Sequence, residues 1–250
     1  MNGPLVVLVD GESPDPWRHP DIPPGYETPA LDEGESVVHV AYYSRVSVEL
    51  RRKADDTWRE VWSTPETATT TVTDRRVVVG CRRYETGSRW VGTGMGAAVA
   101  LGATAISRAR AKARTRGRCL AIQLRHEWIS HILHTANPAG WQGRLARLGG
   151  TPNQQVGVVA WDHGHRWRLM FSAHRPGVDA GLASYLAWTV VRRRWQYQDL
   201  LAEGDLELLR SQGEELRIAA EPGTTEALHL PGAYSIGFNP ATDHHPFERS

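Results

Sequence analysis

Hydrophobic and polar positions alternate with a period of two through much of the first half of the chain. Over residues 38–50 the even positions are mostly apolar and the odd positions mostly polar, as a half-buried strand or a bent pair of strands requires. Residues 58–62 resume the alternation as a short strand. The β-branched run 69–79 is interrupted by a charged triplet at 74–76, which predicts two strands joined by a tight turn.

The second half of the chain continues the strand pattern. After residue 120 the alternation changes phase near Trp128, which predicts a bulge or a strand that changes direction. Residues 156–161 and 166–173 alternate on either side of Gly164, which supplies a turn, and they form the clearest hairpin of the chain.

A helical period begins at Asp179. Residues recur at helical spacing from there, namely Leu182, Tyr185, Leu186, Thr189 and Val190. Three arginines at 192–194 stand near the C-terminal end, where the helix dipole favours cations. Strands, a hairpin and one closing amphipathic helix predict an α+β fold that is mainly β.

The stretch 90–118 is predicted to belong to an insertion into this β-rich domain, at about 86–118. Residues 90–107 carry no charge, and a cation then stands at every even position: Arg108, Arg110, Lys112, Arg114, Arg116 and Arg118. On a helix, Gly94, Ala98 and Gly102 form a small-residue ridge that lets another helix approach closely. One interpretation is a Gly/Ala-rich, then basic, helical segment packed on the domain or on a second copy. The other is a segment that dips into a bilayer, its cations held by anionic lipid at about 1 kcal/mol each.

The two ends of the chain differ from the middle. Residues 1–34 contain seven prolines, which predicts an extended, disordered arm. Residues 197–250 are predicted to form an acidic C-terminal helix followed by an irregular tail, in which residues 230–234 are a candidate apolar latch. The predicted domain therefore spans residues 35–196.

Three pieces of this pattern resemble bacterial pleckstrin-homology-like (PH-like) and GRAM-like domains: the turn segment 71–79 (TVTDRRVVV), the Trp128-Ile129 pair and the helix 179–195. The resemblance covers about residues 35–196. It implies a bent antiparallel barrel or sandwich capped by a C-terminal helix. It also implies an adaptor for lipid, peptide or protein, not usually an enzyme. The insertion departs from the family pattern, and two aspartates dilute the charge of the loop 51–56, which argues against head-group recognition there.

Composition narrows the class of protein further. The chain has 250 residues and a formal net charge of +1, and its apparent neutrality hides a basic middle and an acidic stretch at 199–221. Its two cysteines, Cys81 and Cys119, lie far apart and outside any metal-like spacing, so we expect a reducing cytoplasm. The first residues lack the positive region of a secretory signal.

Catalytic motifs are incomplete in this sequence. Residues 92–97 match a relaxed dinucleotide-binding loop, but cations stand where an acidic residue should follow for the ribose. Residues 126–131 (HEWISH) have one residue too many for the zinc-protease motif, whose histidines are four apart on a helix. The sequence therefore predicts no cofactor and no metal site. A small enzyme remains an alternative if a cleft gathers His126, His131 and His165 with a carboxylate.

The sequence thus predicts a cytoplasmic, non-enzymatic PH-like adaptor that acts through its insertion, either in the cytoplasm or peripherally at the inner membrane face. The expected partner is an anionic membrane surface or a protein, or a second copy of the chain. The binding residues are the six cations of the insertion together with Trp90, Met95 and Leu101, and the packing residues are those of the small-residue ridge. The basic strip also fits nucleic acid, against which the near-zero net charge and the acidic tail argue.

Overall fold

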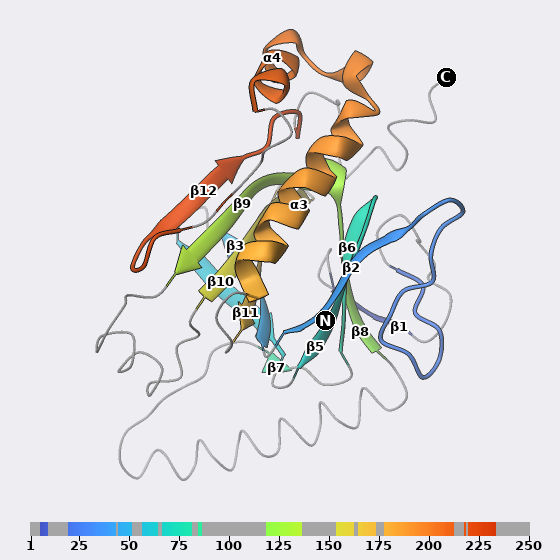
Figure 1. The fold of residues 1–250 in the computed structure, drawn as a ribbon. Coiled ribbons are helices and arrows are strands. Elements are labelled where there is room, and N and C mark those ends of the chain that lie inside the picture. Colours follow the sequence, from blue (N-terminus) through green and yellow to red (C-terminus); the bar gives the residue numbers. More distant parts are fainter. Residues whose placement is uncertain are drawn as a thin grey trace.

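The computed structural model describes residues 6–9, 20–43, 45–51, 57–64, 67–81, 85–86, 119–136, 154–162, 165–173, 178–212, 218 and 220–233. These residues form two antiparallel sheets and two α-helices (Figure 1). The predicted α+β fold, mainly β, is confirmed at this level.

All strand pairs within the two sheets are antiparallel. The five-stranded sheet has the order β1 (Val6–Val9), β8 (Cys119–Arg125), β6 (Arg76–Cys81), β5 (Ala68–Thr73) and β2 (Val37–Tyr43). The seven-stranded sheet has the order β12 (Thr225–His229), β9 (Ile129–Ala136), β10 (Gln154–Asp162), β11 (His165–Ala173), β3 (Arg45–Arg51), β4 (Trp58–Ser63) and β7 (Glu85–Thr86). Both predicted strand pairs with tight turns are present, as β5–β6 and β10–β11.

The chain passes between the sheets more than once, for example from β2 to β3 and from β4 to β5. The crossing of which every residue is described is the 3₁₀ turn η1 (His126–Trp128) between β8 and β9. The predicted change of direction near Trp128 is therefore confirmed. A strand that passes from one sheet to another must bend, and the short turn provides that bend.

The alternation over residues 38–50 differs from the expected single pattern. In β3 the buried apolar residues are Val46 and Val48, at even positions, whereas in β2 they are Ala41 and Tyr43, at odd positions. The core-facing set therefore changes phase between the two strands. Because neighbouring side chains of a strand point to opposite faces, the even-numbered apolar residues of β2 point away from the core.

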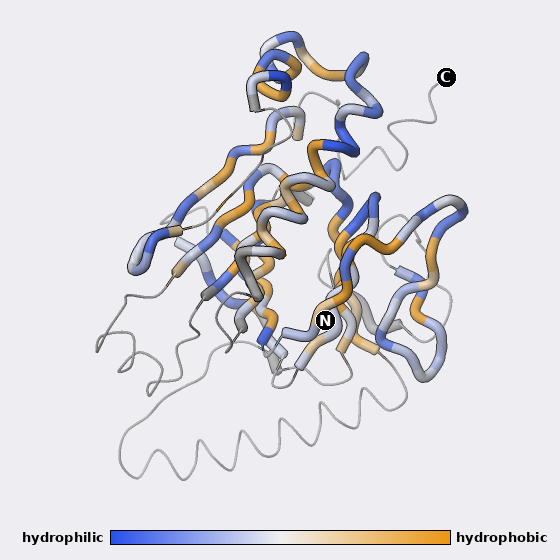
Figure 2. Tube along the Cα trace, viewed as in Figure 1, coloured by the Kyte–Doolittle hydropathy of each residue, from blue (hydrophilic) through white to orange (hydrophobic). Residues whose placement is uncertain are grey.

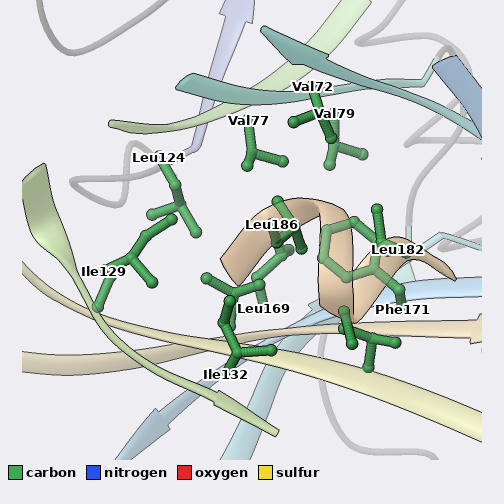
Figure 3. Close-up of a cluster of buried hydrophobic side chains, with 14 of the residues drawn as sticks. Val72, Val77, Val79, Leu124, Ile129, Ile132, Leu169, Phe171, Leu182 and Leu186 are labelled. Atoms are coloured by element: carbon green, nitrogen blue, oxygen red, sulfur yellow. The ribbon is translucent and has the colours of Figure 1, made fainter. Parts of the chain in front are cut away.

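Helix α3 (Val178–Trp195) closes the space between the two sheets, as the helical period predicted. Figure 3 shows Leu182 and Leu186 of α3 converging with residues of both sheets. They belong to one cluster with buried valine, isoleucine, leucine and phenylalanine side chains, among them Val72, Val77, Val79, Leu124, Ile129, Ile132, Leu169 and Phe171. Tyr185, which the spacing placed with the buried residues, is instead 49% exposed.

Parts of the N-terminal arm are attached to the five-stranded sheet, in contrast to the predicted disorder. Val6–Val9 pairs with β8, and residues 20–36 pack on the face of the sheet that points away from α3. Ile22 is buried there against Val78, Cys119 and Ala121. The sequence pattern missed this attachment because the residues that receive the arm are far along the chain.

A buried ion pair fixes the end of this arm. The Arg76 guanidinium donates to both carboxylate oxygens of Glu35, at 2.8 Å from Nε and 2.6 Å from Nη2. It also donates to the Gln123 side chain at 2.7 Å and to the main-chain oxygen of Ala30 at 2.9 Å. Such a two-pronged pair fixes geometry as well as charge, so residues 30–35 form part of the folded domain.

The C-terminal part also returns to the domain. Helix α4 (Glu203–Gln212) follows α3 and the 3₁₀ turn η2 (Gln198–Leu200), and β12 then adds to the edge of β9, within the region predicted to be irregular. Leu230 is fully buried in the main core. Buried Arg194 of α3 donates to the main-chain oxygens of Leu230 and Pro231, and to those of His126 and Ile129. Residues 230–231 are therefore attached to the domain by the burial of Leu230 and by hydrogen bonds from Arg194. The sequence had offered this segment, 230–234, as a candidate apolar latch.

Candidate functional site

Five exposed apolar residues of the described chain lie on β2 and α3, which are neighbours through the contact of His39 with Tyr185. We call this the β2–α3 surface and define it by Val37, Val40, Tyr42, Tyr185, Trp188 and Arg192. Its apolar members are 38–69% exposed, with Tyr42 the most exposed of them. Large apolar side chains gathered at one seam of a folded domain are a common sign of an interaction site.

β2 contributes the first half of this surface because it is an edge strand. It pairs with β5 on one side, and none of the other described strands pairs with its second side. Its sequence, VVHVAYY, contains no Lys, Arg, Asp, Glu or Pro. Natural edge strands are usually protected from unwanted pairing by charges or proline. β12, the edge of the other sheet, does carry a charge at Glu226.

The phase change between β2 and β3 explains why this edge is apolar. Val40 and Tyr42 lie opposite Thr71 and Thr69 of β5, on the outer face of the sheet. Ala41, between them, is buried on the inner face. Figure 2 shows apolar stretches along β2 where it runs past α3. β2 is therefore apolar on both faces although only one of them meets the core.

α3 contributes the second half of the surface. Tyr185, Trp188 and Arg192 are three and seven residues apart, so they share the helix face that is not buried in the core. The Arg192 guanidinium lies 5.1 Å from the centre of the Trp188 ring, a cation–π distance. The surface therefore ends in a positive charge, and Figure 2 shows the hydrophilic C-terminal end of α3.

A ring contact places β2 and α3 beside one another. The rings of His39 and Tyr185 are stacked, with centres 5.4 Å apart and planes 14° from parallel. Burial lowers the pKa of His39 below its usual range, which favours the neutral ring at this contact. β2 and α3 are thus neighbours, with His39 on the α3 side of the sheet and Val40 and Tyr42 on its other side.

The orientation of the seam follows from three hydrogen bonds near its end. Arg193 of α3 donates to Glu127 of η1 at 3.1 Å. The main-chain N–H of His126 in η1 donates to the main-chain oxygen of Arg75 at 3.0 Å. The main-chain N–H of Asp74 donates to the main-chain oxygen of Ser36, also at 3.0 Å. The C-terminal end of α3 therefore lies near the N-terminal end of β2.

The sequence-predicted binding residues lie outside the described residues. This holds for the six cations, for Trp90, Met95 and Leu101, and for the ridge residues Gly94, Ala98 and Gly102. The structure does describe the strand before this segment and the strand after it. The strand before it is β7, which pairs with β4 in the seven-stranded sheet, and the strand after it is β8 of the five-stranded sheet. Cys81 packs in the main core and Cys119 on the opposite face of the sheet, so the two thiols point away from each other.

The histidines of the enzyme alternative differ in their surroundings. His126 is fully buried; burial and then the charges of Arg193 and Arg194 lower its pKa to about 3. His131 is half-buried, and its Nε2 lies 3.3 Å from Nδ1 of His229 on β12. The side chain of His165 lies outside the described part. Within the described ranges, no three His, Cys, Asp or Glu side chains are grouped so as to hold a metal.

His126 and Glu127 have a structural setting instead. They form the 3₁₀ turn at the crossover, and the next residues enter β9, so the arrangement differs from the helix of zinc proteases. Glu127 is buried and paired with Arg193, which ties the crossover to α3. These residues position α3 and hence the β2–α3 surface.

No protein-family model, curated protein or solved structure matches this chain. Among the helices that the structure describes, none is long and apolar enough to cross a membrane. The β2–α3 surface was missed by sequence reasoning. Its signal was present in the uncharged run of β2 and in the Tyr185, Trp188 and Arg192 spacing, but edge position cannot be read from the sequence.

Proposed function

We propose that this protein is a non-enzymatic adaptor with a PH-like domain and that it binds a protein partner through the β2–α3 surface. The observation that carries the proposal is an uncharged edge strand lying beside an exposed aromatic stripe of α3. Aromatic residues and arginine are the residue types that most often anchor protein interfaces. The PH-like assignment is supported by two antiparallel sheets joined by bent crossovers, with a helix between them.

The test compares variants of exposed residues in and away from the surface. We expect the double variant Tyr42→Ser, Trp188→Ser to lose a partner protein that the wild type captures from an extract. The control is Leu208→Ser, because Leu208 is 40% exposed but lies on α4. Each captured protein is then purified and its binding measured by calorimetry. If the double variant binds every purified partner as tightly as the wild type does, the surface is not the binding site.

Binding to anionic membranes through residues 90–118 stays a prediction from the sequence. Its test is co-sedimentation with neutral and anionic vesicles, using the wild type and a variant in which a Gly/Ser linker replaces residues 90–118. Equal pelleting of both proteins excludes the membrane partner. Light scattering on the same pair tests whether the segment mediates self-association.

A further inference from the structure

We infer that the partner presents an extended segment with an acidic residue at its C-terminal end beside Arg192. The segment adds as an antiparallel strand to the edge of β2 that pairs with none of the other described strands. This inference rests on the proposed function, since it names the class of partner for the same surface. Three observations support it: the edge position of β2, the exposed aromatic residues of α3 beside that edge, and the position of the Arg192 charge on α3.

The first step concerns the main chain. An edge strand offers N–H and C=O groups at alternate residues to any segment laid alongside it. β2 has seven residues, and a strand rises about 3.3 Å per residue, so its edge matches a partner segment of roughly five to seven residues. The four strand pairs of the five-stranded sheet are antiparallel. The added strand continues that arrangement.

The second step concerns the side chains of the segment. On one face, an added strand lies next to Val40 and Tyr42; on the other, it lies next to His39 and the ring of Tyr185. Cross-strand pairs between aromatic and β-branched side chains are favourable in antiparallel sheets. Both faces of the segment therefore favour apolar residues, and a run of β-branched and aromatic residues is the expected chemistry.

The third step concerns charge. Arg192 lies at the C-terminal end of α3, which is near the N-terminal end of β2. An antiparallel segment brings its own C-terminal end to that point. A carboxylate there pairs with a guanidinium that already lies against Trp188. The expected segment is therefore an apolar run followed by Asp, Glu or a chain-terminal carboxylate.

The fourth step concerns why the occupant is a single segment and not a second folded copy. α3 lies beside β2, with Tyr185 stacked on His39, and so it flanks the edge along which pairing would occur. A lone extended segment needs only the width of one strand, about 4.8 Å. A second copy would have to bring its own α3 to the same place.

The probe is a display library of random twelve-residue peptides, selected on the full-length protein. We expect the enriched peptides to contain an apolar run followed by an acidic residue. Their affinity should fall about tenfold or more with Trp188→Ser or with Arg192→Glu. Leu208→Ser and Arg210→Glu, at exposed positions on α4, should leave it unchanged. Replacing the acidic residue of the peptide with lysine should restore binding to Arg192→Glu.

Strand addition is tested directly by methylating the peptide's main-chain nitrogens one at a time. Because alternate amides of an added strand bond to β2, we expect losses of about tenfold at every second residue and little change between them. Peptides that depend on Trp188 but show no period of two would overturn strand addition and leave the protein-binding surface standing. Failure of the library to yield Trp188-dependent peptides also overturns the inference, whereas the proposed function is judged by its own capture experiment. A dimer that Val40→Lys dissociates would replace the segment with a second copy.

Discussion

Replacing Glu35 with glutamine removes the buried charge paired with Arg76. Of the ion pairs that the structure describes for this cation, it leaves the one with Asp32, at 3.3 Å, whose side chain is 37% exposed. The side chain of Glu35 is 0% exposed and that of Arg76 is 1% exposed, so solvent does not screen the loss. Glu35 also accepts hydrogen bonds from the Thr73 hydroxyl at 2.6 Å and from the Asp32 amide at 2.8 Å. Breaking a buried pair by removing one partner costs about 3–5 kcal/mol. We therefore expect Glu35→Gln to lower the free energy of unfolding by that amount.

The measurement is urea denaturation followed by the fluorescence of the chain's ten tryptophans. In thermal unfolding each kcal/mol shifts the midpoint by about 2–4 °C for a domain of this size, so we expect a drop of about 6–20 °C. The control is Glu60→Gln. The Arg45–Glu60 pair has a similar distance of 2.6 Å, but its side chains are 45% and 33% exposed. An exposed pair contributes about 1 kcal/mol or less.

Acid should reproduce the effect of the substitution. Burial alone would raise the pKa of Glu35, but hydrogen bonds from Arg76, Thr73 and Asp32, together with the charge of Arg76, lower it below 4.5. A carboxylate whose pKa is lower in the folded than in the unfolded protein stabilises the fold at pH values above its unfolded-state pKa. This stabilisation is lost as the pH falls through its folded-state pKa. Glu35→Gln should therefore lose less stability than the wild type below pH 4.5. The reasoning is refuted if Glu35→Gln costs less than about 1 kcal/mol at neutral pH.

Three further variants test the attachments of the two ends and the buried histidine. A Cβ at Gly80 would lie 2.1 Å from the main-chain oxygen of Glu27, so Gly80→Ala should cost about 1–3 kcal/mol in urea denaturation. The control Gly181→Ala meets nothing within 4 Å on α3 and should gain about 0.5–1 kcal/mol; equal effects of the two would contradict the close contact. Arg194→Met removes the donor shared by four main-chain oxygens, so we expect a loss of about 3 kcal/mol and faster amide hydrogen exchange in β12; unchanged exchange would show that Arg194 does not hold the latch. Because burial lowers the pKa of His126 to about 3, the unfolded chain takes up a proton near pH 6.5 that the native chain does not. The free energy of unfolding should therefore fall between pH 7 and 5, and His126→Leu should reduce this fall by about 2 kcal/mol. If the urea midpoints of both proteins fall equally, another group takes up the proton on unfolding.

Local patterns in the sequence determined the elements and much of their order. The β-branched run broken at residues 74–76 predicted β5–β6, and the period of two predicted β10–β11. The phase slip near Trp128 predicted the crossover, and the helical spacing after Asp179 predicted α3. These features depend on residues a few positions apart, whose relation is fixed by backbone geometry alone. The sequence could likewise identify 90–118 as unusual, but its binding role stays a prediction.

Tertiary structure decided which apolar residues face the core and which face outward. Val40, Tyr42 and Tyr185 follow the same local patterns as buried residues, yet β2 is the edge of its sheet and changes phase before β3. It also decided that Glu35 is the partner of Arg76, which lies 41 residues further along the chain. Edge position, phase and ion pairing all depend on residues far apart in sequence. No local pattern encodes those distances, so the β2–α3 surface became visible only once the two sheets and α3 were assembled.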